Sequence, residues 1–213
     1  MRTGPRFGVY GVGLQLALAL GLGVLASQTD ASQLGPPEAI PRGLTLGLLF
    51  AVPGVIAALG IRGGRAALLI AAAAMDAFSP LLSYATVVFV VPVGLFVAHA
   101  AAVGKAPATI GAVVRSTLLV VALVGLVIGG VGGLLATTEG RCWAAYSTPT
   151  GIEYRYSPYV EGAELGLAPG AIGEGCRAGL LSAPGEAIAA VLSLGAIALA
   201  GLATRRRRQP VSG

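Results

Sequence analysis

Long apolar runs separated by short charged turns are the feature of this chain that most constrains its fold. Ten of the fourteen basic residues flank these runs on what must be one side of a membrane, and seven of the nine acidic residues lie between them on the other side. Lys and Arg near span ends stay cytoplasmic and set the orientation. The pattern predicts a polytopic membrane protein with these basic residues inside: Arg2, Arg6, Arg62, Arg65, Lys105, Arg115, Arg205, Arg206, Arg207 and Arg208.

The overall composition agrees with membrane insertion. Hydrophobic residues make up 55% of the chain and charged residues 11%, against roughly 25% charged residues in an ordinary soluble domain. The net charge of +5 is scattered over loops and one tail, so the expected partner is the lipid bilayer and no nucleic acid is expected. Thirteen Arg against one Lys, with no Asn, suggests a GC-rich bacterial genome and hence a bacterial cytoplasmic membrane.

The lengths of the apolar runs predict six spans. A hydrocarbon core of about 30 Å takes roughly 20 helical residues, whereas Ala66–Ala102 as one helix would measure about 55 Å. Ser79-Pro80 divides that stretch into a short outward span and its return, in a tight hairpin. We therefore expect an all-α, six-helix bundle with both termini cytoplasmic. Its spans are Gly8–Ala26, Gly43–Ile61, Ala66–Phe78, Leu81–Ala102, Ser116–Ala136 and Ala187–Ala203.

The same pattern divides the chain into regions. Residues 1–136 hold the first five spans, 137–185 form an extracytoplasmic loop, 186–204 form the sixth span and 205–213 a basic tail. One alternative concerns residues 1–26, which also read as a signal peptide with a small-residue cleavage site at Val24-Leu25-Ala26. The apolar core of about 18 residues is longer than the usual 7–15, which favours a retained span. The rest of the topology is the same in either case.

The two cysteines, Cys142 and Cys176, both lie in the outer loop. In an oxidising compartment a disulfide between them is expected. Their wide separation does not resemble the Cys-x-x-Cys spacing of a catalytic dithiol. We therefore expect a structural bridge that ties the loop.

Most of the aromatic residues of the loop surround a strand-like segment. Residues 152–160 alternate so that Tyr154 and Tyr156 share one face while Glu153 and Arg155 share the other. Together with Trp143 these tyrosines form either a surface for a partner or headgroups, or a small aromatic core or cap resting on the helices. The loop is too short for an ample core of its own, which favours the cap.

Two features inside the spans point to packing or bending. Gly125, Gly129 and Gly133 share one face of the fifth span, which allows the backbone of another helix to approach closely. That helix is either another span of this chain, which we favour, or one of a second copy. Pro53 and Pro92 sit near the midpoints of the second and fourth spans, where each frees a carbonyl, at Leu49 and Val88.

Asp76 is the one acid inside an apolar run. Its burial costs at least about 2.5–3.5 kcal/mol, so it should face the bundle and have a partner. Pairing the hairpins places it level with Phe50 and Thr86, with Ser79 on its own face, and with the Leu49 carbonyl in reach. Asp76, Ser79 and Thr86 are therefore a candidate ion or proton site, and a hydrated structural carboxylate is the alternative.

No constellation supports an enzyme, because the chain has a single His and neither a nucleophilic triad nor a glycine-rich phosphate loop. No cofactor or metal is expected. The favoured function is a non-enzymatic interaction protein or complex subunit that presents the outer loop, with a membrane protein or a second copy as partner. The alternative is a small transporter or channel component that uses Asp76 and the Pro-kinked second and fourth spans.

Overall fold

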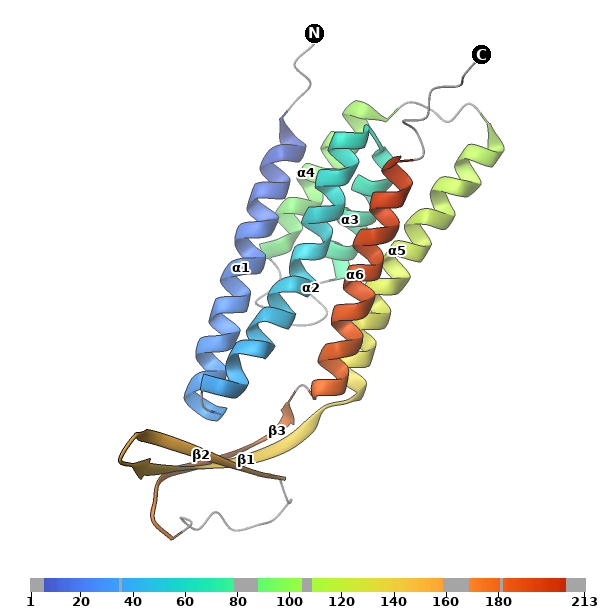
Figure 1. Cartoon of the computed structure of the whole chain (residues 1–213). Helices are drawn as coiled ribbons and strands as arrows, with labels where there is room; N and C mark the ends of the chain where they lie inside the picture. Colours follow the sequence, from blue (N-terminus) through green and yellow to red (C-terminus); the bar gives the residue numbers. More distant parts are fainter. Residues whose placement is uncertain are drawn as a thin grey trace.

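The structure is a computed structural model, in which residues 6–34, 36–78, 88–104, 109–158, 169–180 and 182–205 are described, with the backbone alone for 29–34, 36–38 and 177–180. A helical bundle carries a small β-sheet at one end (Figure 1). The elements are α1 (Phe7–Leu34), α2 (Pro36–Gly63), α3 (Ala66–Phe78), α4 (Val90–Val103), α5 (Ile110–Ala136), β1 (Glu139–Thr148), β2 (Gly151–Pro158), β3 (Ala171–Leu180) and α6 (Ala183–Arg205).

Four of the helices are long and apolar enough to cross a membrane, which indicates a membrane protein. These stretches are Phe7–Gln28, Ala39–Gly63, Ile110–Ala136 and Ala183–Arg205. Polar side chains begin two of the helices: the Thr109 side chain accepts a hydrogen bond from the Ala112 amide at the start of α5, and Ser182 accepts one from Gly185 at the start of α6. Such caps satisfy amides that have no intrahelical partner.

The described ends of the helices sort as the basic residues predict. α1 begins and α6 ends at the end of the bundle opposite the sheet (Figure 1). Arg62 lies in the last turn of α2 and Arg205 in the last turn of α6, and Arg65 directly precedes α3, so all three lie at that same end. Arg206, Arg207 and Arg208, the remainder of the basic tail, lie outside the described residues.

α3 forms the centre of the bundle. Seven of its residues are buried: Leu68, Leu69, Ala71, Ala72, Ala73, Met75 and Asp76. The hydrophobic core joins them to Val52 and Ile56 of α2, to Phe96 of α4 and to Leu123 of α5. Small side chains on α3 allow this close approach from several sides.

The third and fourth helices are too short to cross by themselves. α3 keeps its predicted bounds, whereas α4 begins at Val90 rather than Leu81, and each measures about 20 Å at 1.5 Å per residue. Phe89, directly before α4, stacks on Phe50 near the midpoint of α2, with ring centroids 5.2 Å apart. α4 therefore starts at mid-depth. Pro92 therefore lies in the first turn of α4 and not at the midpoint of the helix. In the first turn the missing N–H of a proline costs little.

The outer loop overturns the expectation of an all-α fold. It forms a three-stranded antiparallel sheet in the order β2-β1-β3. β2 follows the predicted strand, with Glu153 and Arg155 exposed and Tyr154 and Tyr156 half-buried. The sheet lies across the end of the bundle (Figure 1), where β3 contacts α1. The all-α expectation was wrong because a strand needs hydrogen-bonded neighbours, so the recognised strand β2 implied a sheet. The two other strands, β1 and β3, were not recognised because their sequences lack a clear alternation of apolar and polar residues.

Candidate ligand-binding site around Asp76

Asp76 points into the bundle and is held by a residue of the first helix. The Gln15 amide nitrogen donates to Asp76 Oδ1 at 2.8 Å and to the Phe50 carbonyl at 2.9 Å. Gln15 is fully buried and Asp76 is 1% exposed. One amide group therefore links α1, α2 and α3, using both of its N–H groups.

Gln15 was not predicted as a partner. The side chains considered from sequence, Ser79 and Thr86, lie outside the described residues. Leu49 lies beside Asp76 in the cavity described below. The carbonyl that accepts the second hydrogen bond of Gln15 is that of Phe50, the residue after Leu49. The available signal was Gln15 itself, because an amide side chain in the middle of an apolar span also needs a buried partner.

An apolar cavity of about 320 Å³ adjoins Asp76. Three helices line it: α2 supplies Leu49, Phe50 and Pro53, α3 supplies Met75, Asp76 and Phe78, and α5 supplies Val127, Ile128, Val131 and Leu135. Asp76 is the one ionisable side chain among these described lining residues. Its volume falls at the lower end of the range of about 300–1,000 Å³ typical of small-molecule sites.

The glycines of α5 pack against α6, although not all as expected. A Cβ added to Gly133 would lie 2.6 Å from Ile188 Cγ2, and one added to Gly129 would lie 3.5 Å from Leu192 Cδ1. Gly125 has nothing within 4 Å, so it makes no contact with another described helix of this chain, and packing against a second copy stays a prediction. Gly130 takes part instead, since a Cβ added to it would lie 3.5 Å from Ala189 Cα, and the α5–α6 contact therefore follows a slightly rotated face.

The closest helix approach is between α1 and α2, which sequence reasoning missed. A Cβ on Gly43 would lie 2.5 Å from the Gly23 carbonyl oxygen, and one on Gly23 would lie 2.8 Å from the Gly43 carbonyl oxygen. The signal was the recurrence of small residues on both helices: Ala19, Gly23 and Ser27 on α1, Gly43, Gly47 and Ala51 on α2. Their spacing of four places them on one face.

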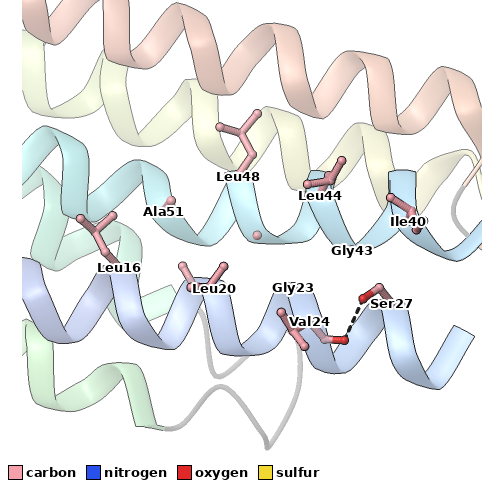
Figure 2. A pocket seen from close by; sticks show the side chains of 12 residues that line it. Leu16, Leu20, Gly23, Val24, Ser27, Ile40, Gly43, Leu44, Leu48 and Ala51 are labelled. Carbon is pink, nitrogen blue, oxygen red and sulfur yellow. Dashed lines mark hydrogen bonds between the residues drawn. The ribbon is translucent and has the colours of Figure 1, made fainter.

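A shallow groove of about 420 Å³ runs along the outside of this helix pair. Leu16, Leu20 and Val24 form one wall and Ile40, Leu44 and Leu48 the other (Figure 2). The Ser27 hydroxyl donates to the Val24 carbonyl at 2.8 Å, as the dashed line marks. The groove therefore presents apolar surface of the kind that faces lipid.

A buried ion pair joins α2 to α6 near the sheet. Arg42 Nε lies 3.6 Å from Glu186 Oε1, and their side chains are 4% and 15% exposed. Glu186 also lies in the first turn of α6, where a negative charge suits the helix dipole. Glu186 therefore both stabilises the start of α6 and links this helix to α2.

The predicted disulfide between Cys142 and Cys176 is present. The two cysteines are paired directly across β1 and β3. Trp143 faces the opposite side of the sheet and packs over Gly173 and Gly175 of β3, where a Cβ on Gly175 would lie 3.0 Å from the indole nitrogen. Trp143 also meets Tyr154 edge-on, with centroids 5.9 Å apart.

The two faces of the sheet therefore differ in chemistry. On the disulfide face the Arg155 guanidinium lies 4.8 Å from the Tyr146 ring. Its Nε lies 3.0 Å from Glu153 Oε1, and this hydrogen bond and the Glu153 charge raise the pKa of Arg155. On the other face, Ile152, Tyr154 and Tyr156 of β2 align with β1 through Ser147, Ala145 and Trp143. We call this second face the aromatic face.

No group of three or more His, Cys, Asp or Glu that could hold a metal ion occurs in the part of the chain that the structure describes. Comparisons of the chain with protein-family models, with curated proteins and with solved structures found no match.

Proposed function

We propose that this chain is a non-enzymatic, multi-pass protein of a bacterial cytoplasmic membrane that presents its sheet outside the cell as a docking surface for a partner protein. The observation that carries the proposal is the separation of the two sheet faces. On the disulfide face the exposed charges of Arg155 and Glu153 pair with each other, whereas the aromatic face leaves an aliphatic side chain, Ile152, 57% exposed. Exposed aromatic and aliphatic residues are typical of interface centres.

The ends of the bundle support the proposed orientation. The described basic flanks lie at one end and the sheet at the other (Figure 1), and because basic flanks favour the cytoplasmic side, we propose that the sheet lies outside. The complete set of six crossings stays a prediction, because α3 and the stacked start of α4 reach only mid-depth. Four crossings with an α3–α4 pair that returns at mid-depth give the same parity and the same orientation.

Accessibility of single cysteines distinguishes the two crossing numbers. The native cysteines are bridged, so a Ser83→Cys chain offers one free thiol to a membrane-impermeant maleimide added outside intact cells. Labelling supports six crossings, and protection supports four with a returning pair. Thr150→Cys in the turn between β1 and β2 should be labelled in both cases, and its protection would overturn the orientation.

Photo-crosslinking in native membranes tests the docking surface. A photoreactive residue at Ile152 should capture a discrete protein, whereas the same residue at Glu153, its neighbour on the opposite face, should not. Cys142→Ser should abolish the capture by loosening the sheet. Capture of lipid alone from Ile152 would contradict the docking role and would make the aromatic face a membrane contact.

The second candidate is a small transporter or channel component. The specific observation in its favour is Asp76 beside a cavity at mid-depth, with Pro53 in the cavity wall. Asp76→Asn keeps the shape of the side chain, so it should leave folding intact and abolish any cation- or proton-coupled flux in proteoliposomes. A flux that survives this change would exclude Asp76 as the coupling group.

A further inference from the structure

We propose that the outer edge of β2 is a self-association site, at which β2 pairs antiparallel with β2 of a second copy of this chain. The pairing is centred on Tyr154 and joins two three-stranded sheets into one. It goes beyond the docking role of the aromatic face, because it uses the edge of the sheet and holds whichever partner that face receives.

β2 stands at one side of the sheet. The strand order is β2-β1-β3, and no strand among the described residues pairs with β2 on the side away from β1. Alternate residues of an antiparallel strand direct their N–H and C=O groups away from its neighbour. Such a row of groups is a template for a further strand. The opposite edge of the sheet differs, because β3 lies against α1.

β2 also lacks the features that commonly protect an edge strand. Bulges, prolines and lysines discourage the pairing of edges. The register between β1 and β2 runs from Gly151 to Pro158 without a shift, whereas the ladder between β1 and β3 is shifted twice. The proline comes last in β2, and the strand contains no lysine. Residues 151–157 therefore form a regular strand that can accept a neighbour.

The charges of β2 identify a second copy as the strand that fits. In an antiparallel pairing centred on Tyr154, Glu153 of each copy lies opposite Arg155 of the other. Opposite charges directly across a strand pair stabilise it, and like charges destabilise it. These two side chains already pair within one chain at 3.0 Å, but they are 51% and 66% exposed. An exposed ion pair contributes little, so little is lost when it is exchanged for two pairs between the copies.

The aromatic face agrees with the same register. Because successive side chains alternate between faces, Ile152, Tyr154 and Tyr156 share this face. Ile152 of each copy lies opposite Tyr156 of the other, and the two Tyr154 side chains meet at the centre. Pairs of an aromatic with a β-branched residue are among the favourable cross-strand pairs. The pairing therefore gives the exposed Ile152 side chain an aromatic neighbour.

The symmetry of this pairing suits a membrane protein. The same edge is used by both copies, so a twofold axis relates them, and for two antiparallel strands in one sheet that axis is perpendicular to the sheet. The sheet lies across the end of the bundle (Figure 1), so the axis runs along the helices. Both bundles then cross the same membrane in the same direction, as two copies of one chain must.

Charge reversal tests the pairing. Glu153→Arg sets arginines opposite arginines, and Arg155→Glu sets glutamates opposite glutamates, so each variant alone should dimerise about tenfold more weakly than the native chain. In an equal mixture every arginine of one variant lies opposite a glutamate of the other, so mixed dimers should form with native affinity. Energy transfer between donor-labelled and acceptor-labelled full chains in detergent measures these dissociation constants.

The mixture also separates pairing between copies from stability of the sheet. Neither variant can form the ion pair within its own chain, and mixing does not restore it. An effect on the sheet alone would therefore leave the mixture as weak as its components. That result, or a native chain that stays monomeric, would overturn the proposal.

Cysteine linking in native membranes tests the register. In Tyr154→Cys the new thiol lies on the axis, with Cα atoms about 5 Å apart. In Ile152→Cys, on the same face, the two copies are four residues apart along the strands, about 13 Å, beyond the reach of a disulfide. Mild oxidation should give a product of twice the chain mass from Tyr154→Cys alone. With the bridge between Cys142 and Cys176 intact as evidence that the sheet has formed, equal or stronger linking through Ile152→Cys would overturn the register.

Discussion

Gln15 is the residue on which the centre of the bundle depends most directly. Gln15→Leu keeps the volume but removes the donor to Asp76 Oδ1 and to the Phe50 carbonyl. A buried acceptor that loses its partner costs about 1–3 kcal/mol, so the free energy of unfolding should fall by at least that amount. Thermal and denaturant unfolding in detergent would measure it. Gln28→Leu, at an exposed position of α1, should have little effect, and equal effects would deny Gln15 its role.

The sequence could predict that Asp76 is buried but not which residue binds it. An acid inside a membrane needs a partner wherever it lies, because its charge is costly to bury. The presence of Asp76 in an apolar run was therefore sufficient to predict that it faces the bundle. The choice of Gln15 depends on how α1 packs against α2 and α4, which brings its side chain to Asp76 across 61 residues of chain. Periodicity within a single span carries no information of that kind, and the hairpin geometry considered from sequence included only neighbouring spans.

Among the helices, the α1–α2 pair makes the least adjustable contact. Gly43→Ala would place a methyl group against the Gly23 carbonyl oxygen, a backbone atom, and against Ser27 Cβ at 2.7 Å. Overpacking of this kind costs about 1–3 kcal/mol, so the unfolding temperature in detergent should fall. Gly21→Ala on the same helix pair meets nothing within 4 Å and should be neutral or slightly stabilising. A larger loss of unfolding temperature from Gly21→Ala than from Gly43→Ala would contradict close contact between α1 and α2 at Gly43.

The link between α2 and α6 gives a second prediction for these elements. Removing one partner of a buried ion pair leaves a charge uncompensated and typically costs about 3–5 kcal/mol. Glu186→Gln should therefore lower the free energy of unfolding markedly. Glu153→Gln, which removes a pair with side chains 66% and 51% exposed, should change it far less, because water screens exposed pairs. Similar losses in the free energy of unfolding from both variants would show that the Arg42–Glu186 pair contributes no more to stability than an exposed pair.

The helix pattern of the spans was largely readable from sequence, whereas the sheet was not. Apolar length and basic flanks give the observed bounds of α3, whereas α4 begins at Val90 and not at the predicted Leu81. β3 carries three glycines and mixed polarity, so it has no alternation to recognise. It is a strand because β1 supplies its hydrogen bonds and Trp143 covers two of its glycines, and both conditions arise only in the folded chain.

At the scale of the whole molecule, we expect the disulfide to stabilise the sheet while the helical bundle is stable without it. The bridge closes a loop across a sequence separation of 34, which is worth about 4 kcal/mol in the chain-entropy model. Cys142→Ser should make the segment between α5 and α6 sensitive to protease while the helices resist, as measured by limited proteolysis of membrane vesicles and mass spectrometry. Simultaneous loss of the helices would show that the sheet and bundle unfold together.

The bond between Gln15 and Asp76 also has a consequence in time. A nascent chain presents its elements in order, so α1 and α2 form their close-packed hairpin before α3 has been synthesised. The Gln15 amide, which donates to the Phe50 carbonyl, is then in place to donate to Asp76 at the depth that Asp76 will occupy. Lowering the acid into the bilayer costs less beside them than in bare lipid. We therefore expect the first two helices to lower the cost of inserting the third.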